Sequence, residues 1–227
     1  MFLRPYDEKD GRMVWLDEDE VELFLSRADD TTTQIAFALG VRCGLRSHEI
    51  VSVTPADIVA TSAGPRVRIE EGKGDTYRET PAPIELYHSA KSAVDFGGID
   101  RHQALVPKST RTIRRWVSTT GDELAEMTGD TGWSYLGSHD LRRTWATQLA
   151  GSGIDPLLVC DWGGWDDIET FLEHYRGVYS PQVQRRELDK VDWLDGDPVD
   201  GDRDPDSWLF GHNTGSREAS SPVKPQG

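Results

Sequence analysis

The sequence predicts an α+β fold that is mostly helical and carries a small antiparallel sheet of about three strands. Apolar residues recur at helical spacing in several stretches, and Ile168, Phe171, Leu172 and Tyr175 are the clearest example. Strand-like segments are confined to residues 57–83, around a glycine-rich turn. A chain of 227 residues can bury the core of one large domain. We expect that domain to cover residues 1–195.

The N-terminal part is expected to contain two helices and the start of a third. Residues 1–14 form a short lead-in. Residues 16–28 predict a helix because acids fill the first turn and apolar residues share one face. Thr31 is the expected cap of a second helix, largely buried, which ends at Gly44. Residues 45–53 begin a further short helix.

Three strands are expected after Pro55, over residues 57–62, 65–71 and 76–83. The turn between the last two has two glycines within five residues, which is typical of the tip of a β-hairpin. Lys73 lies at the apex of this tip.

The C-terminal half is expected to be helical. Residues 138–150 contain no Gly or Pro and open with Ser138 as a plausible N-cap, so His139 and Arg142 share one helical face. A short apolar segment, 157–159, lies between two glycine turns. The other expected helices cover residues 84–96, 168–175 and 181–194. Residues 196–227, rich in Asp, Gly, Pro and Ser, predict an acidic disordered tail.

The net charge of −15 argues, taken alone, against binding a polyanion. Acids are spread along the whole chain and lysine is scarce beside arginine, a composition that resembles proteins of extreme halophiles. In molar salt the Debye length is only ~3 Å, so local basic clusters matter more than the total charge. One such cluster contains Ser and Thr but no acid, and suits phosphate contacts. The basic residues of this cluster are Arg101, Lys108, Arg111, Arg114 and Arg115. The alternative is that they form only a solvated helix face.

Neither a membrane nor a metal is indicated. No apolar run approaches the ~18 residues that span a bilayer, and the N-terminus lacks the apolar core of a signal peptide. We therefore expect a soluble, cytoplasmic protein. Cys43 and Cys160 lie among apolar residues and are expected to be reduced core residues. No metal-ligand spacing or phosphate-binding loop is present, and no cofactor is expected.

Four segments, in order, resemble the catalytic domain of the tyrosine recombinases, the phage integrase family. GLRSHEI resembles the first arginine box, with Arg46 catalytic and Glu49 its helix partner. EGKGDTYRETPAP resembles the hairpin with the catalytic lysine, SHDLRRTWATQL the His-x-x-Arg box, and GGWDDIETFLEHY the box that ends in the nucleophilic tyrosine. The implied catalytic residues are Arg46, Lys73, His139, Arg142, Trp165 and Tyr175.

The resemblance implies site-specific recombination or integration of double-stranded DNA without a metal. Tyr175 would attack the scissile phosphorus and form a 3′-phosphotyrosyl intermediate. Arg46 and Arg142 would bind the non-bridging oxygens. Lys73 would protonate the leaving 5′ oxygen, His139 would assist as acid or base, and the Trp165 indole would donate one N–H. Recombination would need a homo-tetramer on two synapsed duplexes.

Two features depart from the family pattern. Only 45 residues precede Arg46, so an N-terminal core-binding domain is not expected and another DNA-clamping partner would be needed. Trp165 and Tyr175 are ten positions apart, about one more than is common, which leaves Tyr179 as an alternative nucleophile.

The same residues also fit other structural roles and other functions. Tyr175 fits a core aromatic, Arg46 and Arg142 fit structural ion pairs, and Lys73 fits an exposed turn lysine. At the level of function, the alternatives are relaxation of DNA like a type IB topoisomerase, a truncated integrase acting as a DNA-binding regulator, and a structural protein. The occurrence of all six residue types in the family order favours an integrase or recombinase, from a mobile element or an archaeal chromosome.

Overall fold

The computed structural model describes residues 1–6, 10–70, 77–175, 185–186 and 188–191. The chain divides into two compact units, Met1–Arg185 and Arg186–Gly227, and the helices and strands given below all lie in the first. The expected tail 196–227 lies outside the described residues, as does most of the expected helix 181–194.

An N-terminal β-hairpin replaces the expected lead-in, so that prediction was wrong. Strand β1 (Phe2–Pro5) pairs antiparallel with β2 (Arg12–Trp15). The backbone at the end of this hairpin donates hydrogen bonds to side chains of helix α6 (Ser138–Gly151), 126 or more positions away. The Val14 N–H donates to Asp140 Oδ1 at 3.2 Å, and the Leu16 N–H donates to Thr144 Oγ1 at 3.1 Å. Acceptors so distant in sequence leave no local pattern.

Two capped helices and one helical turn follow. Helix α1 (Glu18–Ser26) is capped by Asp17, and α2 (Thr31–Val41) is buried over most of its length. The cap of α2 is Asp30 rather than the expected Thr31, because the Asp30 carboxylate accepts a 2.7 Å hydrogen bond from the Thr33 N–H. Helix α3 (Ser47–Ile50) is a single turn that starts directly after Arg46.

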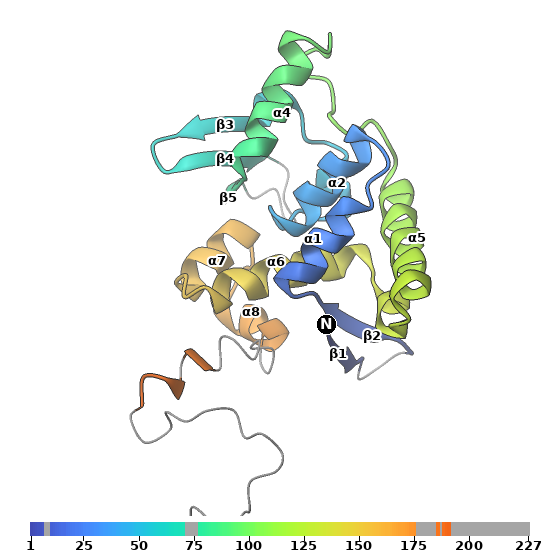
Figure 1. The fold of residues 1–227 in the computed structure, drawn as a ribbon. Coiled ribbons are helices and arrows are strands. Elements are labelled where there is room, and N and C mark those ends of the chain that lie inside the picture. Colours follow the sequence, from blue (N-terminus) through green and yellow to red (C-terminus); the bar gives the residue numbers. More distant parts are fainter. Residues whose placement is uncertain (7–9, 71–76, 176–184, 187, 192–227) are drawn as a thin grey trace, which may run out of the picture. The chain divides into compact units, whose positions relative to one another are not determined.

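A three-stranded antiparallel sheet confirms the predicted fold class. Its order is β3 (Ile58–Thr61), β4 (Gly64–Ile69), β5 (Arg78–Pro81), preceded by the 3-10 turn η1 (Pro55–Asp57). Val67 pairs with Ile58 on one side and Thr80 on the other. Helix α4 (Ile84–Asp95) lies across the sheet in Figure 1 and shares a core cluster with it. The glycine-rich tip with Lys73 lies outside the described residues.

The second half is helical; α5 was not predicted as a helix, and two other expectations need correction. It comprises α5 (Thr110–Thr128), the 3-10 turn η2 (Thr131–Tyr135), α6, α7 (Pro156–Gly163) and α8 (Ile168–Tyr175). The N-cap of α6 is Gly137, and the expected cap Ser138 is its first helical residue. The apolar segment 157–159 lies inside α7, whose N-cap is Asp155.

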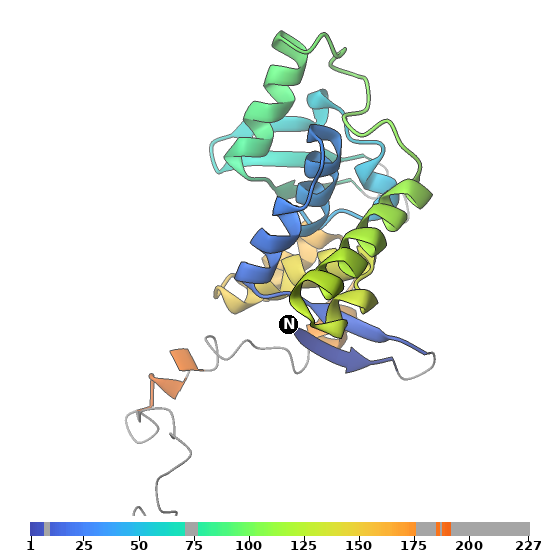
Figure 2. The same cartoon turned by 45° about the vertical axis from the view of Figure 1, so that its right-hand side comes forward.

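Helices α1, α2, α5 and α6 share one core cluster, to which they contribute Phe24, Phe37, Leu124 and Leu141 respectively. Figure 2 shows α5 alongside α1 and α2. A smaller cluster, with Trp145 and Phe171, joins α6, α7 and α8. Cys43 and Cys160 are buried free thiols, as predicted. Within the described residues, no helix has the length and apolar character to cross a bilayer.

Candidate functional site

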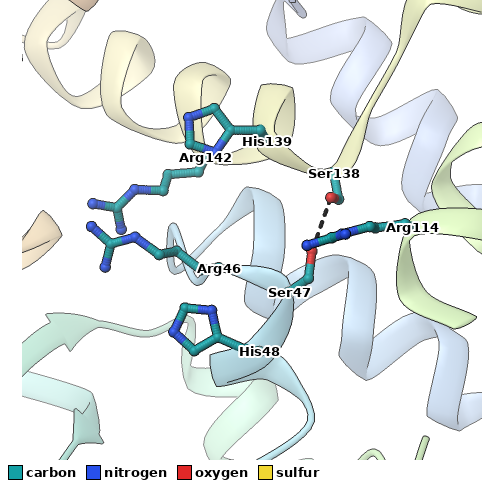
Figure 3. A pocket seen from close by; sticks show the side chains of 7 residues that line it. All are labelled: Arg46, Ser47, His48, Arg114, Ser138, His139 and Arg142. Carbon is teal, nitrogen blue, oxygen red and sulfur yellow. Dashed lines mark hydrogen bonds between the residues drawn. The ribbon is translucent and has the colours of Figure 1, made fainter. Parts of the chain in front are cut away.

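A cavity of about 310 Å³ brings together residues that are far apart in the sequence. It lies between α3, α5 and α6, and Figure 3 shows the lining side chains. Three are predicted catalytic residues and one is a predicted DNA contact. The lining residues are Arg46, Ser47, His48, Arg114, Ser138, His139 and Arg142. With three guanidiniums and no acid among these seven, the cavity suits an anion.

Arg46 is oriented by Glu49, one turn further along α3. The Arg46 N–H donates to Glu49 Oε2 at 2.7 Å, and Nη1 donates to Oε1 at 3.0 Å. Its Nη2 also reaches the Gly164 carbonyl, at 3.4 Å. In Figure 3 its guanidinium lies beside that of Arg142. The predicted pairing of Arg46 with Glu49 is therefore confirmed.

Arg142 is held by backbone carbonyls and by an aromatic ring. Its side chain is buried, and Nη1 donates to the Gly44 carbonyl at 2.7 Å while Nη2 donates to the Gly163 carbonyl. The guanidinium carbon lies 4.1 Å from the centroid of the Trp165 ring, a cation–π contact. Two carbonyls and one ring thus fix the direction of this cation.

Trp165 belongs to an aromatic stack that needs the glycine turn before it. Its ring stacks on Trp145 with centroids 6.3 Å apart, and meets Phe171 edge-on at 5.2 Å. A Cβ on Gly163 would lie only 1.7 Å from Cζ3 of Trp165, so no other residue fits there. Packing between α6 and α8 thus holds Trp165 beside Arg142.

Arg78, at the start of β5, is a site residue that the sequence analysis missed. Its Nη1 and Nη2 each donate to one oxygen of Glu49, both at 2.8 Å, and Nε donates to the Trp162 carbonyl at 3.1 Å. Both side chains of the pair are buried. The only available signal was an arginine at an inward-facing strand position, two residues before the buried Thr80 and on the same face of β5.

The pKa of the Glu49 carboxylate lies well below its usual range. Burial acts to raise its pKa, but hydrogen bonds and charge from Arg78, and then Arg46, outweigh burial and lower the pKa to about 2. Glu49 is therefore ionised throughout the neutral range and serves two arginines at once.

The predicted basic cluster is exposed, but its members lie at different places. Arg114, on α5, lines the cavity close to the hydroxyl pair Ser47–Ser138, whose oxygens are 2.9 Å apart (Figure 3). Arg101 instead lines a second cavity of about 290 Å³ near α4. The remaining members are also exposed: Lys108 lies just before α5, and Arg111 and Arg115 lie in its first turns.

Part of the predicted site falls outside the described residues. Lys73 and Tyr179 are among them. Tyr175 is described as the last residue of α8, but its side chain is not among the parts that the structure describes. His139 and Arg142 lie one turn apart on α6 and both line the cavity, as their spacing predicts.

Residues 14–180 match the phage integrase family. The fold resembles the XerA recombinase with a TM-score of 0.61 and 22% identity, covering 78% of this chain and 64% of that one. It also resembles the Tn1549 transposon integrase in complex with transposon right end DNA (TM-score 0.60, 18% identity, 82% and 69% covered). It resembles the catalytic domain of bacteriophage HP1 integrase with a TM-score of 0.53 and 14% identity, covering 79% of this chain and 97% of that one.

The chain thus spans less than two thirds of the length of the XerA recombinase and nearly all of the HP1 catalytic domain. No curated protein matches the sequence significantly. The family match extends over well more than half of the chain and includes every segment around the cavity. The mostly helical fold with its small three-stranded sheet agrees with that of a tyrosine recombinase catalytic domain. The chain belongs to the phage integrase family.

Proposed function

We propose that this protein cuts and rejoins double-stranded DNA at a specific site, with Tyr175 as the nucleophile. The observation that carries the proposal is the meeting of Arg46, His139 and Arg142 around one cavity, although Arg46 lies more than ninety positions before the other two. Membership of the phage integrase family supports the same reaction. A relative of similar fold, the Tn1549 integrase, has been solved with transposon end DNA.

In the proposed cleavage step, the Tyr175 phenol oxygen bonds to the scissile phosphorus while the bond from phosphorus to the 5′ oxygen breaks. The phenol proton leaves to a base, and the 5′ oxygen takes a proton from Lys73. The energy of the phosphodiester is kept in the 3′-phosphotyrosyl bond, so the reverse reaction rejoins DNA without a cofactor. Arg46 and Arg142 bind the non-bridging oxygens as charge builds up in the transition state.

His139 and Trp165 have supporting roles in this proposal. A phenol has a pKa near 10, so Tyr175 needs help in losing its proton near neutral pH. An imidazole at His139 can accept and return that proton. Trp165 supplies one N–H donor and, through its ring face 4.1 Å from Arg142, a support for that cation.

The DNA backbone would run past the cavity towards the start of α5. The basic cluster at Arg101, Lys108, Arg111, Arg114 and Arg115 is proposed to bind phosphates, with Arg114 nearest the reacting phosphate. Recombination is proposed to take place in a homo-tetramer on two synapsed duplexes, with a further DNA-clamping partner. An acidic surface suited to molar salt fits the net charge of −15, and a halophilic host is part of the proposal.

Covalent trapping tests the proposal. Nicked suicide duplexes from the ends of the element that encodes the chain are incubated at high KCl with the wild type, Tyr175→Phe and Tyr179→Phe. We expect a protein–DNA band on a denaturing gel for the wild type and Tyr179→Phe only. A band that survives in Tyr175→Phe and is lost in Tyr179→Phe moves the nucleophile to Tyr179.

The other outcomes decide between functions. Binding to DNA without any adduct refutes cleavage and leaves a DNA-binding regulator. Relaxation of supercoiled DNA without synapsis indicates chemistry of the type IB topoisomerase kind. An adduct that forms equally with unrelated duplexes refutes site specificity.

A further inference from the structure

The buried carboxylate of Glu49 accepts hydrogen bonds from two arginines that lie in different elements, Arg46 at the start of α3 and Arg78 in β5. Oε1 of Glu49 accepts from Arg46 Nη1 at 3.0 Å and from Arg78 Nη1 at 2.8 Å. Oε2 accepts from the Arg46 backbone N–H at 2.7 Å and from Arg78 Nη2 at 2.8 Å. Each oxygen is therefore shared between the two residues. Only Arg46 lines the cavity; Arg78 lies behind Glu49 and is 6% exposed.

Arg78 also contacts the backbone turn that precedes α8. Its Nε donates to the Trp162 carbonyl at 3.1 Å, and a Cβ on Gly164 would lie 2.8 Å from its Cδ. The Gly164 carbonyl in turn accepts from Arg46 Nη2 at 3.4 Å. Arg78 therefore touches both groups that orient Arg46, namely the Glu49 carboxylate and the 162–164 turn.

We infer that Arg78 is a positioning residue for DNA cleavage: it holds Glu49 and the 162–164 turn so that the Arg46 guanidinium points into the cavity. The inference rests on the proposed function. Arg78 lies five positions after Lys73 and begins strand β5, and its guanidinium binds the same carboxylate that holds Arg46. This pair joins β5 to α3, the helical turn that follows Arg46.

The physical reason lies in the geometry of a shared bidentate pair. Two parallel N–H···O bonds from a planar guanidinium fix both the position and the plane of the carboxylate. Without Arg78, a carboxylate that is 1% exposed keeps its hydrogen bonds from Arg46, with His48 Nε2 4.0 Å from Oε1, and is free to rotate and to take up a proton. Arg46 would then lose its fixed direction, and a misplacement of about 1 Å costs on the order of 100-fold in rate.

Arg68 on the neighbouring strand β4 provides a matched control. It also pairs with a carboxylate, Glu79, at 3.1 Å, but its side chain is 44% exposed and it touches neither Glu49 nor Arg46. An exposed pair of this kind contributes little to stability. Arg68→Met thus removes an arginine and its ion pair from the same sheet and leaves the cavity intact.

The test measures single-turnover cleavage of a nicked duplex at saturating protein, with either a normal phosphate or a methylphosphonate at the scissile position. The methylphosphonate has no negative charge, so a cation on the non-bridging oxygens matters less to its cleavage. We expect Arg78→Met to cleave the phosphate about 100-fold more slowly than the wild type, with DNA affinity changed by less than about threefold. On the methylphosphonate the deficit should shrink to below about tenfold, as it should for Arg46→Ala.

Folding is controlled by thermal unfolding and by a second variant. Because Arg78→Met leaves the Glu49 charge buried with one partner fewer, the double variant Glu49→Met/Arg78→Met removes the pair together. It should fold and show the same slow cleavage of the phosphate, while Arg68→Met cleaves like the wild type.

The outcomes separate the two proposals. A folded Arg78→Met or double variant that cleaves the phosphate like the wild type overturns the inference. So does a deficit of equal size on the phosphate and the methylphosphonate, because Arg78 would then act by general stability and not through Arg46. A folded, DNA-bound wild type that cleaves neither substrate refutes the proposed function itself, and the inference with it.

Discussion

We expect Glu49 to make the free energy of unfolding of this protein fall at acid pH, and Glu49→Gln is the sharpest test of that dependence. The substitution keeps the shape of the side chain but removes the charge that Arg46 and Arg78 share. Burial alone would raise the pKa of Glu49, yet Arg78 and Arg46 lower it from 4.5 to about 2. The folded protein therefore favours the ionised over the protonated form of Glu49 much more strongly than the unfolded chain does.

The pKa difference translates into a free energy of unfolding. One pKa unit equals about 1.4 kcal/mol, so the shift corresponds to roughly 3 kcal/mol at neutral pH. Since the folded pKa is the lower one, this contribution is fully present above pH ~4.5 and is lost as the pH falls towards 2. Glu49→Gln should thus unfold more easily by roughly 3 kcal/mol at pH 7. About 2 kcal/mol of that difference should have disappeared by pH 3.

Urea unfolding followed by tryptophan fluorescence, at pH 7, 5, 4 and 3, measures the difference between wild type and variant. The buried Asp140, whose pKa burial raises, titrates in both proteins and cancels from the difference. Glu18→Gln is the control, because Glu18 also pairs with an arginine, Arg42, but is 62% exposed. A difference that stays constant from pH 7 to pH 3, or stays below about 1 kcal/mol at pH 7, would refute the reasoning.

Two further predictions concern DNA binding and the glycine behind Arg142. The first uses the exposed arginines of α5, which are Arg111, Arg114 and Arg115. Their joint replacement by Ala should weaken DNA binding and flatten its salt dependence, and an unchanged slope in a salt titration would remove α5 from the interface. In the second, Gly44→Ala should lower the free energy of unfolding by about 3 kcal/mol, because Gly44 has φ +70° and a Cβ there would lie 2.3 Å from Trp145. Gly129→Ala, at φ +73° with open space around it, should lose only about 1 kcal/mol, and equal losses in denaturant melts would disprove the steric argument.

The elements that could be predicted are those whose signals are local. The three strands, α4 and α8 agree with their expected ranges within a few residues, because glycines and apolar spacing mark them within a short window. The hairpin β1–β2 could not be foreseen, since Asp140 and Thr144 hold it from across the fold. Helix α7 was missed because its apolar residues are too few to show a period before Gly163 ends it.

The residues of the candidate site, like the elements of the fold, were predictable where the signal was local and not where it depended on distant contacts. The order and spacing of the motifs were enough to select Arg46, His139 and Arg142, which line one cavity, because a motif depends only on residue types and their order along the chain. Only tertiary structure could join Arg78 to Glu49 and bring Arg114 into the cavity that Arg46 and Arg142 line. It also decided that the Gly44 carbonyl holds Arg142. A buried ion pair or a carbonyl contact forms only when the fold brings two distant backbone segments together. No local sequence pattern indicates which distant residues will make such a contact.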